Sequence, residues 1–371
     1  MKLSTSSGDL LTQLQSVARV ASTRSAVQAL SGVQVVATTG GVELRATDME
    51  VGLRVPLSAD VVREGTVVLP ARLFLDVARN LKDVGGSVSL ELRPEQGDVE
   101  LAAGDARFDL RTLRAEDFPT LPEPGGDTVV TVPSAAFVET IEKVSRSASR
   151  DETRPILTGI LVSAQGAELR MVATDSYRLS VKETALETPL EGGFEANVPA
   201  RALDELRSVT AATGAEEIRV GVRANQVVFE AGGVVLSSRL IDGQFPNYRQ
   251  LLPEAFEHEL RISGEELGGV VRRISLMAQK NAPLRLSFSD GELVVSAQTP
   301  DVGEAREPLP VPFQGEAFEI GFNPEFLRDG LDSLGGDDLL LKLISPLRPG
   351  LIESADGSGF LYLIMPIRLN V

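Results

Sequence analysis

The stretch Ala46-Thr47-Asp48 returns as Ala173-Thr174-Asp175 and, in a weaker form, as Ala297-Gln298-Thr299-Pro300-Asp301. The first and second copies lie 127 residues apart, and the second and third lie 124 residues apart. This spacing is longer than the roughly 20–50 residues of a solenoid repeat. It is close to the length of one compact domain, roughly 100–150 residues. The sequence therefore predicts three similar domains in one chain.

Each copy opens with the pattern of an amphipathic helix. Apolar residues recur at steps of three and four residues after Asp9, after Pro133-Ser134 and after Ser263, which is the spacing of one helix face. We expect Asp9 to cap the first of these helices. Ser263 and Glu266 have the spacing of a capping box at the start of the third.

Short runs of alternating apolar and polar residues follow each opening helix and predict strands around 33–36, 41–45, 160–162 and 293–295. A second helix is predicted after Pro70, after Pro199 and after Asn323-Pro324. Two helices that cover the apolar face of antiparallel sheets give an α+β fold. Linkers at 122–126 and 252–254 place the predicted domains at 1–127, 128–256 and 257–371.

The composition excludes several kinds of chemistry. The chain has no cysteine and one histidine, His258, which rules out a Cys-His nucleophile and makes a typical zinc site unsuitable. It contains no P-loop, no G-x-G-x-x-G dinucleotide motif and no G-x-S-x-G elbow. We therefore expect no metal and no cofactor, and we interpret His258 as a solvent-exposed surface residue. Carboxylates are plentiful, so a carboxylate-dependent enzyme stays open, although no pair of them stands out as catalytic.

Charge and hydropathy restrict the expected location of the protein and the way in which it would contact nucleic acid. No apolar run reaches the roughly 18 residues of a membrane span, and residues 1–7 lack the apolar core of a signal peptide, so a cytoplasmic protein is expected. The net charge is −17, which opposes binding of DNA mainly by phosphate neutralisation. The six predicted helices, however, carry equal numbers of basic and acidic residues. Any contact with nucleic acid would therefore depend on a local basic surface.

The chain resembles the bacterial sliding clamps, the family of beta subunits of DNA polymerase III, from Met1 to Leu369. The most specific stretches are Ala173 to Leu179, Asp242 to Tyr248 and Met365 to Leu369. The resemblance implies a processivity factor of DNA replication and not an enzyme. Two chains of three clamp domains would form a homodimeric ring of six domains around duplex DNA, bind it independently of sequence and slide along it.

The resemblance also implies a site for partner proteins. The DNA polymerase III catalytic subunit, the clamp loader, translesion polymerases, ligase and mismatch repair proteins would each dock a short peptide in an apolar pocket between the second and third domains. Arg178 and Arg368 would offer hydrogen bonds at its rim. Tyr177 and Gln250 stand where other members often have His and Arg, which leaves the peptide preference open. The implied pocket residues are Leu157, Thr174, Ser176, Tyr177, Arg178, Leu179, Pro246, Gln250, Leu251, Asn323, Leu363, Met365, Pro366, Ile367, Arg368 and Leu369.

Two further surfaces follow from the resemblance. Arg24, Arg72 and Arg201 would lie near the encircled DNA, and the further candidates for this role are Arg79, Lys82, Arg146 and Arg150. The first domain of one chain would join the third domain of its partner. The apolar residues at this joint would be Phe108 and Leu110 on one side and Leu276 and Met277 on the other.

Two other classes of protein stay open from the residues alone. A carboxylate-dependent hydrolase on a repeated scaffold would show a deep acidic cleft in which the pKa of a Glu or Asp is raised. A self-assembling structural protein without DNA would need neither a cleft nor a peptide site, and the tail from Met365 to Leu369 argues against it.

Overall fold

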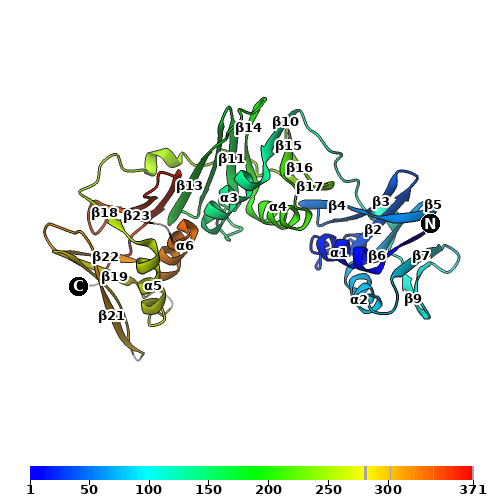
Figure 1. Ribbon diagram of the computed structural model, residues 1–371, viewed down its shortest axis with the longest axis horizontal. Helices are drawn as coiled ribbons and strands as arrows, with labels where there is room; N and C mark the ends of the chain where they lie inside the picture. The colour runs from blue at the N-terminus through cyan, green and yellow to red at the C-terminus, as the bar shows by residue number, and fades with distance from the viewer. Residues whose placement is uncertain (280–281, 301, 337, 370–371) are drawn as a thin grey trace. The chain divides into compact units, whose positions relative to one another are not determined.

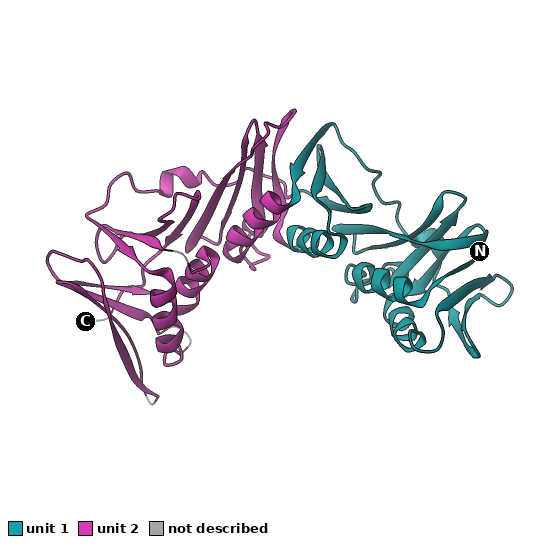
Figure 2. Cartoon of the chain, viewed as in Figure 1, with its two compact units in different colours: residues 1–134, 201–240 teal, residues 135–200, 241–371 magenta. Residues whose placement is uncertain are grey.

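The computed structural model describes residues 1–279, 282–300, 302–336 and 338–369 (Figure 1). Asp301, in the third copy of the repeated stretch, lies outside the described residues. The chain folds into two compact units, one of residues 1–134 and 201–240 and the other of residues 135–200 and 241–371 (Figure 2). Because this division passes through the middle copy of the repeat, the boundaries near residues 127 and 256 stay a prediction.

The first unit begins with a five-stranded antiparallel sheet in the order β5-β1-β7-β8-β9. The helices α1 (Ser7–Val17) and α2 (Ala71–Leu81) lie next to each other (Figure 1). They bury Leu10, Leu14 and Phe74 completely. The strands of this sheet are β1 (Lys2–Ser6), β5 (Ala59–Arg63), β7 (Ser87–Arg93), β8 (Asp98–Ala103) and β9 (Ala106–Arg111).

A second sheet of the first unit has eight strands in the order β10-β15-β16-β17-β4-β3-β2-β6. Strand β17 pairs antiparallel with β4 and sets Leu236 opposite Leu53, so strands from the first and second copies of the repeat share one sheet. The strands are β2 (Gly32–Thr38), β3 (Gly41–Thr47), β4 (Val51–Leu57), β6 (Gly65–Pro70), β10 (Thr128–Pro133), β15 (Glu217–Arg223), β16 (Gln226–Ala231) and β17 (Val234–Arg239).

The second unit repeats this arrangement with an eight-stranded sheet in the order β14-β11-β12-β13-β25-β24-β23-β18. Here β13 pairs with β25 and sets Leu179 opposite Leu363, which joins the second and third copies. The strands are β11 (Gly159–Gln165), β12 (Glu168–Thr174), β13 (Arg178–Ala185), β14 (Gly193–Pro199), β18 (His258–Ile262), β23 (Leu339–Leu343), β24 (Gly350–Ser354) and β25 (Phe360–Ile364).

A four-stranded sheet in the order β21-β20-β19-β22 completes the second unit. Helices α5 (Gly264–Ser275) and α6 (Pro324–Leu334) lie side by side (Figure 1). Helix α3 (Ser134–Val144) lies almost entirely in the second unit, whereas α4 (Ala200–Thr213) lies almost entirely in the first. The strands are β19 (Leu284–Ser289), β20 (Glu292–Thr299), β21 (Gly303–Pro310) and β22 (Phe318–Phe322).

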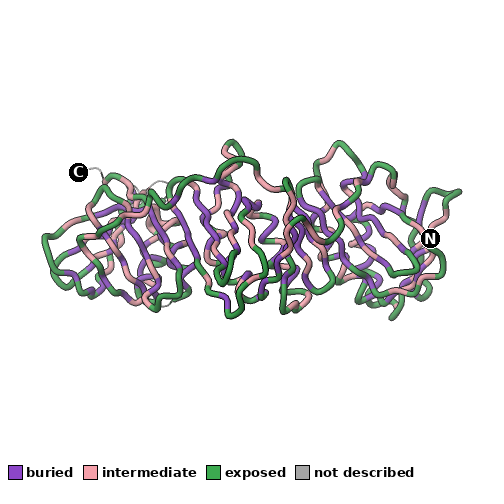
Figure 3. Tube along the Cα trace, turned by 90° about the horizontal axis from the view of Figure 1, so that it is seen from above, coloured by how far each residue is buried: buried purple, intermediate pink, exposed green. Residues whose placement is uncertain are grey.

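Burial follows the strand period of two. In β23, Leu339, Leu341 and Leu343 are buried, whereas Leu340 and Lys342 between them are partly exposed. Figure 3 shows the same alternation of buried and exposed positions along other strands. The apolar faces selected by this alternation form the core of each unit.

The helix starts confirm most of the predicted caps. Ser263 Oγ accepts the N–H of Glu266 at 3.3 Å, and Asn323 Oδ1 accepts the N–H groups of Glu325 and Phe326 at 2.9 and 3.2 Å. The prediction that Asp9 caps α1 is wrong, because Ser6 ends β1 and its Oγ accepts the N–H of Asp9 at 3.1 Å. Asp9 instead lies in the first helical turn, where a carboxylate still complements the helix dipole.

His258 is not the solvent-exposed surface residue that the sequence predicts. Its ring is half-buried and stacks on Phe318 at a centroid distance of 5.3 Å, with Phe313 at 4.9 Å. The sequence around His258 is rich in glutamate, but aromatic residues more than 50 positions away cover one side of the ring. The histidine is therefore part of an aromatic cluster.

Candidate functional site

The second copy of the repeated stretch forms a tight turn between β12 and β13. Thr174 Oγ1 donates to the carbonyl of Arg178 at 2.7 Å. Asp175 Oδ1 accepts the N–H groups of Tyr177 and Arg178 at 2.9 and 3.0 Å. An Asp side chain commonly closes a turn by such bonds to the following backbone. We call residues 174–178 the Asp175 turn.

The first copy forms the same turn between β3 and β4. Thr47 Oγ1 donates to the carbonyl of Val51 at 2.8 Å, and Asp48 Oδ1 accepts the N–H groups of Glu50 and Val51 at 3.1 and 2.9 Å. We call residues 47–51 the Asp48 turn. In the third copy, Thr299 Oγ1 donates instead to the carbonyl of Met277 at 2.8 Å. The repeated tripeptide is therefore a turn motif, and the weaker third copy has a different local role.

The Asp175 turn presents an exposed apolar surface. The side chains of Tyr177 and Met365 are 60% and 42% exposed, and the N–H of Met365 donates to the carbonyl of Tyr177 at 2.9 Å. A buried apolar cluster beside them contains Leu179 and Leu363, which lie opposite each other two positions further along β13 and β25. Large exposed apolar groups beside a buried cluster are typical of a surface that binds a partner.

The other implied pocket residues fall into three groups. Leu157 and Thr174 are buried, and Asn323 is the half-buried cap of α6. Pro246, Gln250 and Leu251 are exposed and flank Tyr248 of the same apolar cluster. In the tail, Ile367 donates its N–H to the carbonyl of Gly321 at 2.8 Å and Pro366 is half-buried. Ser176, in the Asp175 turn, is exposed.

The end of the tail borders a separate cavity of about 610 Å³. Ile367, Arg368 and Leu369 line it together with Arg285 and Glu304 of the four-stranded sheet. All three tail residues therefore border this second hollow, and Ile367 also makes the strand-like contact with Gly321.

Arg178 does not lie at a rim. Its side chain is 9% exposed, its Nε donates to Asp175 Oδ2 at 3.0 Å and its Nη1 donates to Asp329 Oδ2 at 2.6 Å. Burial disfavours the positive charge of the Arg178 guanidinium and acts to lower its pKa. Interactions with Tyr362, Asp329 and Asp175 outweigh burial, so the pKa of Arg178 is raised. The expected rim role is thus corrected, because both donating edges already face carboxylates of the same unit.

Helix α6 contributes residues that the sequence patterns missed. The ring centroid of Phe326 lies 4.4 Å from the Arg178 guanidinium and 6.4 Å from the ring of Tyr177, whose plane is tilted by 27°. Asp329 follows Phe326 by three positions, which puts both on one helix face. That spacing was visible in the sequence, but their partner Arg178 lies 151 residues before Asp329.

The seven basic residues implied for DNA are all exposed. Three of them contact carboxylates: Arg201 pairs with Asp48, Arg79 with Asp76 at 3.0 Å, and Arg146 with Asp329 and Asp332 at 3.6 and 3.8 Å. Within the described ranges, the other four form no ion pair and could meet phosphates directly. These four are Arg24, Arg72, Lys82 and Arg150.

The four residues implied for the dimer joint also differ in how exposed they are. Phe108 and Leu276 are 37% and 83% exposed, and Phe108 lies on β9, the outermost strand of its sheet. Leu110 is buried in its own unit, and Met277 packs against the core of the second unit. Phe108 and Leu276 are therefore the two most exposed of the four, and Met277 is partly exposed.

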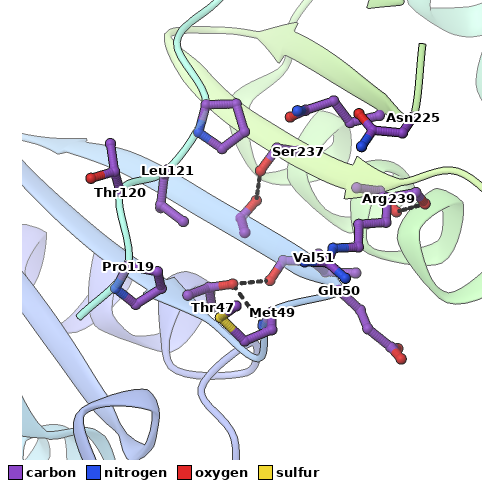
Figure 4. Close-up of a pocket in the computed structure, with 14 residues that line it drawn as sticks. Thr47, Met49, Glu50, Val51, Pro119, Thr120, Leu121, Asn225, Ser237 and Arg239 are labelled. Atoms are coloured by element: carbon purple, nitrogen blue, oxygen red, sulfur yellow. Dashed lines mark hydrogen bonds between the residues drawn. The ribbon is translucent and has the colours of Figure 1, made fainter. Parts of the chain in front are cut away.

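A cavity of about 210 Å³ lies beside the Asp48 turn (Figure 4). It is lined by strand β17, by the turn and by the segment from Pro119 to Pro122. Ser237 lies opposite Gly52 in the ladder, and Arg239 donates its N–H to the carbonyl of Glu50 at 3.0 Å. The same ladder positions beside the Asp175 turn hold Leu363, Leu179 and Met365, so the first turn has a polar version of that surface.

The residues that the structure describes contain no cluster of three or more His, Asp or Glu side chains suited to a metal ion. Burial of Asp204, on α4, outweighs the nearby Arg207 and leaves the pKa of this carboxyl above its ordinary value, but Asp204 is not part of the Asp175 turn. No helix in the described part of the chain is long and apolar enough to span a membrane.

The comparisons with known proteins cover the whole chain. Residues 1–122, 131–247 and 249–368 match the family models of the N-terminal, central and C-terminal domains of the DNA polymerase III beta subunit. The beta sliding clamp of Synechococcus elongatus is 33% identical over 100% of both chains, and that of Streptomyces coelicolor is 31% identical over 92% of both.

Solved structures agree with this match. The DNA polymerase sliding clamp of Bacillus subtilis superposes with a TM-score of 0.92 at 27% identity over 100% of both chains. A sliding clamp of Pseudomonas aeruginosa bound to griselimycin gives a TM-score of 0.90 at 28% identity, again over 100% of both chains. The chain therefore consists of three clamp domains and belongs to the bacterial DNA polymerase III beta subunits, the sliding clamps, which are non-catalytic processivity factors of DNA replication.

Proposed function

We propose that two copies of this chain close into a ring that encircles duplex DNA and tethers the DNA polymerase III catalytic subunit to it. Membership of the clamp family supports the proposal. Each chain of the proposed ring would contribute the predicted domains 1–127, 128–256 and 257–371. Because the bacterial chromosome is replicated in the cytoplasm, we propose that the protein acts there.

The proposed ring closes through apolar residues at exposed ends of the fold. Strand β9, which carries Phe108, and strand β21 are each the last strand of a sheet, and Leu276 follows α5, which packs against β21. Exposed strand edges and apolar side chains favour association with another chain. Leu110 and Met277, also implied at the joint, would support this contact from inside each protomer.

Weak contacts would hold the encircled DNA. The exposed basic residues, Arg24, Arg72, Arg79, Lys82, Arg146, Arg150 and Arg201, offer phosphate contacts that do not depend on base sequence. The overall charge of −17 opposes tight binding, which suits a protein that must slide. Each of these contacts is expected to weaken as salt rises.

The proposed docking site for partner peptides is the surface around the Asp175 turn. The observation that supports it most strongly is the exposure of Tyr177 and Met365, which a backbone hydrogen bond holds together beside the buried Leu179 and Leu363. An aromatic ring and a flexible thioether adapt to different partners. The proposed occupants are peptides of the polymerase, the clamp loader, translesion polymerases, ligase and mismatch repair proteins.

Retention on circular DNA tests the ring. The protein is loaded onto nicked circular plasmid with a clamp loader and ATP, and gel filtration then measures how much stays bound before and after the plasmid is cut once. A ring is expected to be retained on the circle and released from the linear form. Equal retention on both forms would contradict encirclement.

Peptide binding tests the docking site separately. A fluorescein-labelled peptide with the clamp-binding motif of the polymerase catalytic subunit is titrated with the protein, and anisotropy gives its affinity. Met365→Asp is expected to weaken binding at least tenfold because it places a charge on an apolar surface. An unchanged affinity for this variant would contradict the site, while Leu347→Asp, at another exposed leucine, serves as the control.

A further inference from the structure

One carboxylate contacts both the proposed peptide site and the proposed DNA surface. Asp329 Oδ2, on α6, accepts a hydrogen bond from Arg178 Nη1 at 2.6 Å, and Asp329 Oδ1 lies 3.6 Å from Arg146 Nη1. Arg178 belongs to the Asp175 turn, which carries Tyr177. Arg146 is one of the basic residues proposed to meet phosphates. Asp329 therefore connects the two surfaces directly.

The contact with Arg178 is tight. The guanidinium is buried, its second edge donates to Asp175 Oδ2 at 3.0 Å and its plane lies over Phe326. Charge-assisted hydrogen bonds of this length are among the stronger polar contacts in proteins. Since Phe326 also stacks on Tyr177, helix α6 sets the position of the exposed ring through Asp329 and Phe326.

The contact with Arg146 is loose. The Arg146 side chain is half-exposed and lies 3.6 Å from Asp329 and 3.8 Å from Asp332, and Asp332 also has Arg272 at 3.7 Å. Exposed ion pairs of this kind contribute little to stability and are screened by salt. A DNA phosphate can therefore draw Arg146 away from Asp329 at small cost.

The first unit offers an internal comparison. Glu205 on α4 faces Arg19 at 3.4 Å, much as Asp329 faces Arg146. However, the Asp48 turn has Val51 where the Asp175 turn has Arg178, so no guanidinium of the turn reaches Glu205. An ion pair between an acid of a helix and an arginine that follows another helix thus occurs in both units, but in the second unit the acid also holds the turn.

We propose that Asp329 is a positioning residue of the peptide site. When Arg146 contacts DNA, Asp329 binds Arg178 more strongly. While Arg146 pairs with Asp329, the negative charge of the carboxylate is shared between two guanidinium groups. When a phosphate takes Arg146, that charge is left to Arg178 alone, and the turn that carries Tyr177 is held more firmly. This coupling rests on the proposed function, and its consequence is that the protein binds the peptide more tightly when it is on DNA.

The test measures peptide affinity in two states of the same protein. The labelled polymerase peptide is titrated against free protein and against protein loaded on nicked plasmid and freed of loader by gel filtration. The wild-type protein is expected to bind about threefold more tightly on DNA, the size of effect that one partly exposed ion pair can supply.

Three variants separate the parts of the inference. Arg146→Gln is expected to give the free protein the tighter, DNA-like affinity and to remove most of the gain on loading. Asp329→Asn is expected to weaken the peptide and to abolish the difference between the two states. Glu205→Gln, the matched change in the first unit, is expected to keep both the wild-type affinity and the wild-type gain.

The outcomes that overturn the inference are distinct from those that overturn the docking site. If Asp329→Asn keeps the wild-type affinity and gain, or if Arg146→Gln keeps the full gain, Asp329 does not link the surfaces. Arg146 lies on the surface, so its variant remains informative even if Asp329→Asn folds poorly. If the wild-type protein itself binds no peptide, or if Met365→Asp binds normally, the docking site is wrong instead.

Discussion

Met49 and Ser176 adopt the same left-handed backbone conformation, with φ of 80° and 81°. They hold the same place in the Asp48 and Asp175 turns, and each donates its N–H to the hydroxyl of the preceding threonine. Among the residues that the structure describes, no other non-glycine residue has a positive φ. Such a conformation costs a non-glycine residue on the order of 1 kcal/mol. The two turns therefore share their strain as well as their hydrogen bonds.

Replacing Met49 by glycine tests this strain. Met49→Gly is expected to raise the free energy of unfolding by about 0.5–1 kcal/mol, because relief of the backbone strain exceeds the entropy cost of glycine in a turn already closed by Asp48. Met49 is 46% exposed, so the glycine and alanine variants both lose some buried side-chain surface, and the difference between them reports the backbone strain. Urea unfolding measures the change, and Met49→Ala, which keeps the strain, is the control. A glycine variant no more stable than the alanine variant would count against strained backbone.

Gly330 tests the packing between α6 and β25. A Cβ at this position would lie 2.6 Å from two ring carbons of Tyr362, a fully buried residue whose hydroxyl donates to the carbonyl of Phe326 at 2.7 Å. Gly330→Ala is expected to destabilise the protein by about 1–3 kcal/mol through overpacking.

Gly268 in α5 provides the matched control. A Cβ there meets only the flexible tip of Arg272 at 3.8 Å, so Gly268→Ala is expected to stabilise the protein by about 0.5–1 kcal/mol as alanine replaces glycine within a helix. Urea unfolding of both variants gives the comparison. Similar effects of the two changes would contradict the packing argument at Gly330.

Glu43 gives a prediction about pH. Burial raises the pKa of this carboxyl, but hydrogen bonds from Arg54 and Arg45 outweigh burial and leave it below the ordinary value of 4.5. A group whose pKa is lower in the folded than in the unfolded chain stabilises the fold fully above its unfolded pKa. This contribution is lost as pH falls through the lower, folded pKa.

Glu43→Gln is therefore expected to reduce stability at neutral pH by about 0.5–1 kcal/mol, a modest value because the side chain is about a third exposed. Below pH 4.5 the difference from wild type is expected to shrink. Urea unfolding at several pH values measures it, with Glu152→Gln, at an exposed residue, as the control. A difference that stays constant down to about pH 3 would exclude the linkage.

The dimer joint is tested by charge at its exposed apolar residues. Leu276→Asp is expected to yield a monomer in size-exclusion chromatography with light scattering while keeping a cooperative unfolding transition, because this side chain is largely exposed in the protomer. Phe108→Asp is expected to act in the same way. Leu347→Asp should leave the dimer intact. A Leu276→Asp protein that still runs as a dimer would show that the joint lies elsewhere.

Local patterns in the sequence were sufficient for the helices and for many strands. Ser263, Asn323 and the apolar steps after them act within one or two turns, so their effect can be inferred from neighbouring residues. The partner of Arg178, by contrast, lies on a helix 151 positions away, and only the folded chain shows that the guanidinium is buried. Leu110 illustrates the same limit, because alternation in β9 cannot distinguish a core position from an interface.

The pairing of strands across copies of the repeat also depends on distant residues. Strands β4 and β17 form one continuous ladder, and so do β13 and β25. A chain cut near residue 127 would separate the first pair, and a cut near residue 256 would separate the second. Each cut would leave two bare strand edges with unpaired backbone groups, which invite aggregation. The three copies are thus repeats in sequence, but a single copy produced alone is not an independent module.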